Sequence, residues 1–151
     1  MKLLFICTGN TCRSPMAESI AREMFGQEVE VESAGLEAWD GEPASTHAVQ
    51  VMQERALDLS KHYSRRITLE MMDRADYIIP MTKGQEQVLL AKYPVYAHKI
   101  RRLGDWGNES QDICDPWGGS LQVYRNCADQ IAHILLRLQR ELCNQQNHDL
   151  G

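Results

Sequence analysis

Two cysteines, an arginine and a serine stand within eight residues near the start of the chain. The segment Cys7–Ser14 has the sequence Cys-Thr-Gly-Asn-Thr-Cys-Arg-Ser, and Pro15 follows it. Gly9 and Asn10 are the residue types that most easily adopt left-handed backbone angles, so successive amide groups can turn inward. A concave ring of N–H groups binds an anion, and the positive N-terminal end of a following helix strengthens that binding. These residue types predict a loop that binds one phosphate group.

Within the Cys7–Ser14 loop, the side chains supply the chemistry. Arg13 offers a planar guanidinium that can bind two phosphate oxygens at once. The positive field of Arg13 and of the helix end favours the thiolate form of Cys7, and Ser14 can donate a hydrogen bond to that thiolate. A thiolate beneath a bound phosphate is a nucleophile directed at phosphorus. We therefore expect phosphoryl transfer to Cys7.

Several other interpretations of this loop fit the residues less well. The nucleotide-binding P-loop ends in Gly-Lys-Ser/Thr and the dinucleotide fingerprint has three spaced glycines, and neither pattern is present. If Cys7 were only a buried structural thiol, Arg13 and Ser14 would have no explanation. A papain-like cysteine enzyme has a local signature that this chain lacks, and a different fold pattern.

The Cys7–Ser14 loop lies between a predicted strand and a predicted helix. Lys2–Cys7 is a short apolar run that glycine and asparagine end, which is typical of a buried strand. From Pro15, apolar residues recur at three- and four-residue steps through Phe25, as in an amphipathic helix. Further strands are predicted over Val29–Glu32, Asp76–Met81 and Lys99–Leu103, and further helices over Thr46–Leu57, Leu69–Ala75, Lys83–Lys92 and from Ser120 onwards. This alternation predicts an α/β fold, a doubly wound parallel sheet with helices on both faces, in which ligands bind at the carboxyl ends of the strands.

A long turn-rich segment, Gly104–Gly119, precedes the last helix and contains the candidate general acid. A loop of this length inside a compact domain is usually functional. A carboxylic acid beside the phosphate can protonate the departing group, which is worth about 10²–10⁴-fold in rate. Asp115 stands before Pro116 in this segment, and Asp112 is its rival three residues earlier. Asp115 can equally be an Asx-turn residue that starts the last helix, so spacing alone leaves both roles open.

The composition is that of one globular domain spanning residues 1–151. Of the 151 residues, 43% are hydrophobic and 25% are charged, and the formal net charge is −5, which excludes a disordered chain and argues against a nucleic-acid partner. The first apolar run is too short for a signal peptide, and no segment approaches the ~20 apolar residues of a membrane span. We therefore expect a cytoplasmic enzyme or binding domain without a membrane partner.

Because cytoplasmic thiols stay reduced, we expect no disulfide framework. No spacing between histidines and cysteines in the sequence fits the ligands of a zinc ion.

The wider motif Cys-Thr-Gly-Asn-Thr-Cys-Arg-Ser-Pro-Met-Ala-Glu resembles the low-molecular-weight protein tyrosine phosphatase family. The resemblance covers nearly the whole chain and extends through Ser33-Ala34-Gly35, Ala75-Asp76, Met81-Thr82 and Asp115-Pro116-Trp117-Gly118-Gly119. It implies a four-stranded parallel sheet, phosphorylated proteins as substrates, and no cofactor or metal. It also implies roles for single residues: Cys7 is the nucleophile, Arg13 binds phosphate, Asn10 and Ser14 hold the loop, and Asp115 is the general acid.

The residue at position 11 bears on substrate choice. Family members that act on phosphotyrosine usually have an aliphatic residue here, and Thr11 resembles the branch that hydrolyses phosphoarginine in proteins. A small polar side chain can order a water molecule or contact the guanidinium phosphate, and it can close the deeper approach that a phenol needs. We therefore predict a protein-arginine phosphatase, with a protein tyrosine phosphatase of the same mechanism as the alternative. Trp39 and Trp117 are candidate walls of the substrate pocket, although an ordinary surface or core aromatic residue explains Trp39 equally well.

Cys12 lies five residues from Cys7 on a tightly curved loop. An oxidised Cys7 can be captured by a nearby thiol as a reversible disulfide, and the family resemblance supports this protective role for Cys12. Without the resemblance, a small loop-filling residue explains Cys12 equally well. The expected phosphate-binding loop comprises Thr8, Gly9, Asn10, Thr11, Cys12 and Ser14, besides the catalytic Cys7 and Arg13.

Two other functions remain as alternatives on the same loop. An arsenate reductase of this fold needs a further cysteine pair midway along the chain, and none occurs between Pro15 and Ile113. A non-catalytic phosphoprotein-binding module would keep the anion-binding loop without needing Cys7 or Asp115, and both residues are present. The sequence therefore favours an enzyme, and it gives no indication of an oligomeric state.

Overall fold

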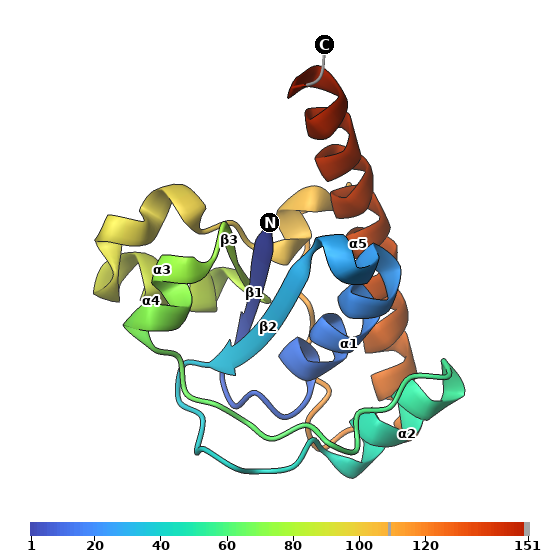
Figure 1. Cartoon of the computed structure of the whole chain (residues 1–151). Coiled ribbons are helices and arrows are strands. Elements are labelled where there is room, and N and C mark those ends of the chain that lie inside the picture. Colours follow the sequence, from blue (N-terminus) through green and yellow to red (C-terminus); the bar gives the residue numbers. More distant parts are fainter. Residues whose placement is uncertain (109, 150–151) are drawn as a thin grey trace.

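A parallel sheet forms the centre of the molecule in the computed structural model, which describes residues 1–108 and 110–149. Its strands are β1 (Lys2–Cys7), β2 (Glu30–Gly35) and β3 (Tyr77–Pro80), in the order β2-β1-β3 (Figure 1). Strand β1 is paired on both sides, and its apolar residues are fully buried, as expected for a central strand of a parallel sheet. The register pairs Cys7 with Gly35, so the end of β2 lies beside the loop that follows β1.

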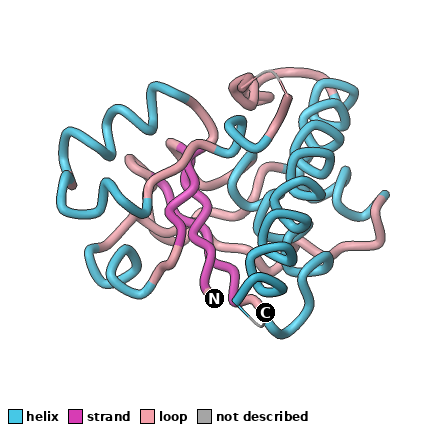
Figure 2. The backbone as a smooth tube through the Cα atoms, turned by 90° about the horizontal axis from the view of Figure 1, so that it is seen from above, coloured by secondary structure: helices cyan, strands magenta, loops and turns pink. Residues whose placement is uncertain are grey.

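Helices form most of the rest of the molecule (Figure 2). The α-helices are α1 (Arg13–Phe25), α2 (Thr46–Glu54), α3 (Leu69–Arg74), α4 (Lys83–Lys92) and α5 (Leu121–Asp149). Short 3₁₀-helices are η1 (Gly26–Glu28), η2 (Pro94–Lys99) and η3 (Leu103–Trp106). Side chains of Ser45, Thr68 and Thr82 accept hydrogen bonds from the first turns of α2, α3 and α4, which explains where these three helices begin.

Two groups of helices cover the two faces of the sheet (Figure 1). Because side chains alternate along a strand, Leu3 and Phe5 of β1 pack into one core with residues of α1, α2 and α5. Leu4 and Ile6 pack into a second core with residues of α3 and α4. The predicted α/β arrangement with helices on both faces is therefore confirmed.

The predicted fourth strand over Lys99–Leu103 is wrong, and the sheet has three strands within the described residues. Ile100 makes one isolated parallel bridge to Ile78, and the N–H of Arg101 donates to the Ile78 carbonyl at 3.0 Å. The 3₁₀-helix η2 ends at Lys99 and η3 begins at Leu103. Too few extended residues remain between them for a strand.

Two element ends differ from those predicted by three residues, whereas the other differences are of one or two residues. Strand β2 continues through Ser33 to Gly35, where the sequence predicts a break, because pairing with β1 outweighs the weak strand preference of glycine. Helix α2 ends at Glu54 and not at Leu57, and Ala56 adopts a left-handed φ of 61° just beyond its end. The longer β2 brings its end, Gly35, beside Cys7 at the carboxyl edge of the sheet.

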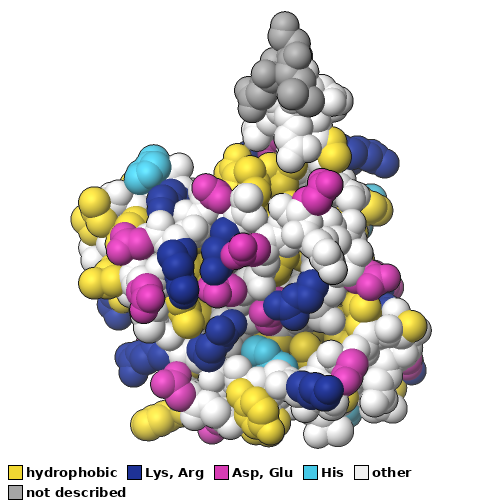
Figure 3. All heavy atoms as spheres, in the orientation of Figure 1, with side chains coloured by type: hydrophobic (Ala, Val, Ile, Leu, Met, Phe, Trp, Pro, Cys, Tyr) yellow, Lys and Arg dark blue, Asp and Glu magenta, His cyan; other side chains and the backbone are white. Residues whose placement is uncertain are grey.

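The surface carries charges of both signs. Figure 3 shows Lys and Arg side chains interspersed with Asp and Glu side chains on the face that Figure 1 presents. In the part of the chain that the structure describes, no helix is both long and apolar enough to cross a membrane.

Candidate active site

The Cys7–Ser14 loop turns between the end of β1 and the start of α1, at the carboxyl edge of the sheet. Asn10 has a φ of 57°, in the left-handed region, whereas Gly9 does not adopt a positive φ. Asn10 alone therefore provides the left-handed turn that the sequence assigns to Gly9 or Asn10. Because α1 begins at Arg13, the positive end of this helix is directed at the loop.

Cys7 lies at the base of the loop, buried and within reach of two hydrogen-bond donors. Its Sγ atom is 2.8 Å from the Ser14 Oγ atom, and the backbone N–H of Asn10 donates to it at 3.2 Å. Hydrogen bonds to a sulfur atom stabilise its negatively charged form. Because Ser14 Oγ also accepts from Asn10 Nδ2, its own hydrogen is available to the Cys7 sulfur.

Asn10 connects the loop to the rest of the molecule through its polar groups. Its Nδ2 atom donates to Ser14 Oγ at 2.8 Å and to Ser33 Oγ at 3.0 Å. Its Oδ1 atom accepts from the Arg65 N–H at 2.9 Å, and its carbonyl oxygen lies 2.8 Å from His62 Nε2. Because a carbonyl oxygen only accepts, His62 Nε2 carries the hydrogen of this bond. The strained turn at Asn10 is thus held by contacts from several parts of the fold.

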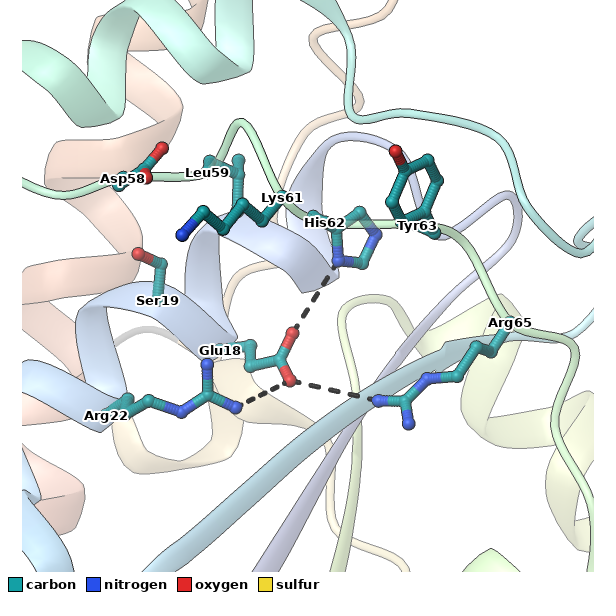
Figure 4. A pocket seen from close by; sticks show the side chains of 9 residues that line it. All are labelled: Glu18, Ser19, Arg22, Asp58, Leu59, Lys61, His62, Tyr63 and Arg65. Carbon is teal, nitrogen blue, oxygen red and sulfur yellow. Dashed lines mark hydrogen bonds and ion pairs between the residues drawn. The ribbon is translucent and has the colours of Figure 1, made fainter.

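Glu18, a buried carboxylate of α1, lies behind these contacts (Figure 4). Ser33 Oγ donates to its Oε2 atom at 2.9 Å, and the Arg22 guanidinium donates to its Oε1 atom at 3.0 Å. His62 Nδ1 and the Arg65 guanidinium lie 3.8 Å and 3.9 Å from the same carboxylate. These partners compensate for the burial of the charge.

Sequence reasoning missed these supporting residues. Glu18 and Ser33 stand inside the motifs that carry the family resemblance, which is the signal that marks them. No local pattern marks His62, because its contact with Asn10 joins residues 52 positions apart.

The end of β2 approaches the loop so closely that a side chain does not fit there. A Cβ atom on Gly35 would lie 2.6 Å from the Thr8 carbonyl oxygen and 3.0 Å from the Asn10 nitrogen. The next residue, Leu36, donates its N–H to the Cys7 carbonyl at 2.9 Å. Backbone packing against β2 therefore determines the path of the loop just after Cys7.

Arg13 is buried and joins the loop to the segment that carries Asp115. Its NH1 group donates to the Ile113 carbonyl at 2.9 Å, and its NH2 group lies 3.7 Å from Asp115 Oδ2. The Asp115 side chain is 59% exposed, and its Oδ1 atom accepts from the Trp117 N–H at 3.1 Å. Asp115 thus makes the Asx turn and also stands beside Arg13, so the two roles are compatible.

The rival carboxylate, Asp112, has other partners. Its Oδ1 atom accepts from the Lys83 N–H and from the Arg102 guanidinium, each at 2.9 Å. Among the described contacts, none joins Asp112 to Arg13. Of these two carboxylates, Asp115 is the one that contacts Arg13.

Two other loop side chains have partners outside the loop. Thr8 Oγ1 accepts from Gln85 Nε2 at 3.2 Å. Cys12 Sγ lies 3.5 Å from both Ser45 Oγ and Tyr124 Oη. Burial, together with the hydrogen bond to Cys12, raises the pKa of Tyr124 to about 12. The Tyr124 hydroxyl therefore stays protonated and can donate to the sulfur.

The three residues considered for substrate choice differ in exposure. Thr11 is half-buried, and its Oγ1 atom lies 3.8 Å from Cys12 Sγ. Trp39 is 80% exposed and Trp117 is 76% exposed, so the interpretation of Trp39 as a core residue is wrong. Both indole rings are largely exposed on the surface.

The site offers room for a ligand but no metal centre among the described residues. A cavity of about 350 Å³, lined by Thr8, Arg13 and Gln85 among others, opens beside the loop. No group of three His, Cys, Asp or Glu side chains in the described part of the chain could hold a metal ion. A cysteine sulfur contacted by hydrogen-bond donors, with a guanidinium and a carboxyl group that meet in the same part of the fold, can support nucleophilic attack on phosphorus with acid catalysis.

Comparison with known proteins agrees with this geometry. Residues 2–148 match the model of a family described as low molecular weight phosphotyrosine protein phosphatase. A protein-arginine-phosphatase of Bacillus subtilis is 36% identical over 146 residues, which cover 94% of this chain and 97% of that protein. The low molecular weight protein-tyrosine-phosphatase PtpB of Staphylococcus haemolyticus is 35% identical over 142 residues, which cover 92% of this chain and 98% of that protein.

A solved structure is similar over nearly the same length. The YwlE arginine phosphatase from Geobacillus stearothermophilus superposes with a TM-score of 0.92 at 35% sequence identity, covering 97% of this chain and 96% of that one. Family model, relatives and fold thus agree along the whole chain. The chain belongs to the low molecular weight phosphotyrosine protein phosphatase family and is a cysteine-dependent phosphatase.

Proposed function

We propose that the protein removes phosphate from phosphoarginine side chains of other proteins, with Cys7 as the nucleophile. The arrangement around Cys7 carries this proposal: Ser14 and the Asn10 amide contact its sulfur, and Arg13 and Asp115 meet at 3.7 Å. These are the groups that a phosphocysteine mechanism needs, and they come together at the carboxyl edge of a parallel sheet.

In the first step, the Cys7 thiolate attacks phosphorus in line with the leaving group. An S–P bond forms as the P–N bond to the guanidine breaks, and the Asp115 carboxylic acid gives its proton to the departing nitrogen. Arg13 and the loop N–H groups stabilise the charge on the three equatorial oxygens.

In the second step, a water molecule attacks the phosphorus of the phosphocysteine. The proton of the water passes to the Asp115 carboxylate, the S–P bond breaks, and the electron pair of that bond returns to Cys7 as a thiolate. The hydrogen bond from Ser14 stabilises this thiolate as it leaves. Release of inorganic phosphate restores the starting state.

The preference for phosphoarginine is supported by relatives and by Thr11. Protein-arginine-phosphatases of Bacillus subtilis and Geobacillus stearothermophilus are each 36% identical to this chain. Thr11 places a hydroxyl group within the loop where an aliphatic side chain would favour a phenyl ring. Protonation by Asp115 also makes the guanidine a good leaving group.

Phosphotyrosine is the second candidate substrate, and two observations favour it. Trp39 and Trp117 expose indole rings that can pack against a phenyl ring. A tyrosine phosphatase of Staphylococcus haemolyticus is 35% identical to the chain, almost the same value as for the arginine phosphatases.

A side-by-side measurement of kcat/KM on a phosphoarginine protein and on a phosphotyrosine peptide separates the two substrates. We expect a preference for phosphoarginine of about tenfold or more, in the range by which an active site discriminates related groups. Faster hydrolysis of phosphotyrosine would overturn the substrate assignment without affecting the proposed chemistry at Cys7.

The Thr11→Ile variant tests whether this residue selects the substrate. Its ratio of kcat/KM values should shift towards aryl phosphates by about tenfold. Thr46→Ile, at an exposed position in the first turn of α2, is the matched control and should leave the ratio unchanged. An unchanged ratio in Thr11→Ile would remove Thr11 as the selector.

We propose in addition that Cys12 protects Cys7 from irreversible oxidation. Hydrogen peroxide converts the Cys7 thiolate to a sulfenic acid, and the Cys12 thiol then displaces water to form a disulfide that thiols reduce. Both cysteines are buried free thiols within one short loop. Mass spectrometry after mild peroxide treatment should detect this disulfide, and sulfonic acid at Cys7 in its place would contradict the proposal.

A further inference from the structure

A second cavity lies on the side of Asn10 that carries its carbonyl oxygen. It has a volume of about 360 Å³ and lies between α1 and the segment of residues 58–65 (Figure 4). His62 is part of its wall, and we call it the His62 cavity. Its charged and polar lining also includes Glu18, Ser19, Arg22, Asp58, Lys61 and Arg65. The proposed phosphatase mechanism uses none of these side chains.

The two carboxylates of the His62 cavity already have hydrogen-bond donors. Glu18 accepts from Ser33 and Arg22 and lies near His62 and Arg65. Asp58 Oδ1 accepts from both the backbone N–H and the hydroxyl of Ser60. Neither carboxylate needs a ligand to compensate its charge.

The cations of the cavity, in contrast, keep unused donors. Within the described residues, the Lys61 ammonium makes no hydrogen bond and no ion pair, and the Ser19 hydroxyl makes no hydrogen bond. Arg22 and Arg65 each contact Glu18 through NH2, and the same nitrogen donates to a backbone carbonyl of β2, that of Val31 or of Ser33. Among the described contacts, the NH1 and Nε groups of both side chains keep their donors. In Figure 4, Ser19 and the ends of Lys61 and Arg22 lie on one side of Glu18, together with Asp58, and Arg65 lies on the other. The hydrogen bonds from Ser60, and to a smaller extent the Lys61 charge, lower the pKa of Asp58.

A cavity with three cations, two satisfied carboxylates and an excess of free donors fits a ligand rich in acceptor oxygens. We propose that the His62 cavity binds a small phosphate-type dianion, either free phosphate or a phosphate monoester, through Ser19, Lys61 and Arg22. Lysine and arginine bind such anions by charge and by charge-assisted hydrogen bonds. A molecule of this size fits easily into about 360 Å³.

Occupancy of the cavity acts on the Cys7–Ser14 loop through Ser33. A bound dianion draws Arg22 towards itself, so Glu18 loses a partner and holds the Ser33 hydroxyl, which donates to it at 2.9 Å, more strongly. Ser33 Oγ in turn accepts from Asn10 Nδ2 at 3.0 Å, and the Asn10 N–H contacts Cys7 Sγ. A more firmly held Asn10 presents the loop amides to substrate phosphate at lower entropic cost. This coupling rests on the proposed phosphatase function, whereas binding to the cavity does not.

Binding is tested by NMR titration of the full chain with inorganic phosphate. The wild type should show two sites, one that shifts the amides of the Cys7–Ser14 loop and one that shifts Ser19 and Lys61. Lys61 is exposed, so Lys61→Ala should keep the fold and lose only the second site. Arg140→Ala on α5, also an exposed cation, should keep both. A single site in the wild type, or a second site that survives in Lys61→Ala and in Arg22→Ala, would overturn the proposal.

The source of the ligand is distinguished by repeating the titration with methylphosphonate, which resembles a monoester and cannot be hydrolysed. Binding of phosphate but not methylphosphonate at the second site identifies free phosphate as the ligand. Binding of both phosphate and methylphosphonate at the second site shows that the cavity also accepts phosphate monoesters. Binding of neither would overturn the proposal as the single-site result does.

The coupling is tested by kcat/KM for a small aryl phosphate at increasing phosphate concentration. Phosphate should inhibit Lys61→Ala as a simple competitor. In the wild type and in Arg140→Ala, kcat/KM should rise above that curve by up to about fivefold, the lower end of typical coupling between sites, while the loop is still largely free of phosphate. The curves should converge as phosphate fills the loop, because the occupied cavity strengthens the binding of phosphate and of substrate alike. Coinciding curves would remove the coupling and leave the binding site. Absence of phosphatase activity would contradict the proposed function, and the NMR titration would still report on the cavity.

Discussion

The two sides of the proposed active site are built differently. The Cys7–Ser14 loop is held from behind: Asn10 is buried and bonds to Ser33, Arg65 and His62, which come from distant parts of the chain. The Asp115 side chain has less support, because this carboxylate is 59% exposed and its contact with the loop is one of 3.7 Å to Arg13. One side is rigid by construction, and the other can adjust.

This difference suits the two tasks. A phosphoryl group has the same shape in every substrate, so a fixed ring of donors can be complementary to its transition state. The leaving group differs between substrates, and an exposed acid can reach a nitrogen or an oxygen at slightly different places. Mutations that separate the two sides test this division of labour.

The largest effect is expected for Cys7→Ala. Without a nucleophile, turnover should fall by about four orders of magnitude or more, while phosphate affinity is largely kept because the loop amides and Arg13 remain. Steady-state kinetics measures the turnover, and calorimetry measures the phosphate affinity. Cys143→Ala, an exposed cysteine of α5, is the control and should behave as the wild type. Normal turnover in Cys7→Ala would end the assignment of the nucleophile.

The next effect is expected for Asp115→Asn, on the adjustable side. We expect kcat to fall by about 10²–10⁴-fold, since an amide cannot protonate the leaving group, with the midpoint of thermal unfolding unchanged because the side chain is exposed. The matched variant Asp112→Asn should show the reverse, because Asp112 binds Arg102 and the Lys83 amide: nearly normal kcat and lower thermal stability. Equal losses of kcat in the two variants would contradict the role of Asp115.

A smaller effect is expected for Ser33→Ala, on the rigid side. This change removes one partner each from Asn10 Nδ2 and from Glu18, and unsatisfied buried groups cost about 1–3 kcal/mol. Urea unfolding should show this loss, and phosphate affinity should fall with it. Ser60→Ala, which removes a hydrogen bond in an exposed turn, is the control. If Ser33→Ala kept both stability and phosphate affinity, the Cys7–Ser14 loop would not depend on the hydrogen bonds of Ser33 to Asn10 and Glu18.

The smallest effect concerns Cys127, which contacts the Cys114 carbonyl with its Sγ atom at 3.7 Å and so joins α5 to the acid-bearing segment. Burial raises the pKa of Cys127 from 9.0 to about 12. The folded protein therefore holds this proton more tightly than the unfolded chain, and the resulting stability is complete below pH 9 and lost between pH 9 and 12. Unfolding free energies should decline less steeply over this range in Cys127→Ala than in the wild type. If the unfolding free energy fell equally steeply with pH in both proteins, burial would not raise the pKa of the Cys127 thiol.

The sequence predicts those parts of the molecule whose causes are local. Helix α4 has its predicted bounds because Thr82 and Gln85 form a capping box at its start, and Cys7, Arg13 and Ser14 stand in one short motif. The predicted fourth strand fails because the 3₁₀-helices on either side of Ile100 leave no room for it. The contact of His62 with Asn10 has no local sign, since it depends on how the fold brings the 58–65 segment against α1.

Gly35 has a consequence for how this protein can diverge. A side chain there would meet the backbone of Thr8 and Asn10. Any substitution of Gly35, at the end of β2, would therefore displace the loop backbone next to Cys7. Trp39 and Trp117 are exposed and can be exchanged without moving that backbone. Substitutions at these two exposed positions are therefore open to evolution or to a directed library, whereas Gly35 leaves no space for any side chain.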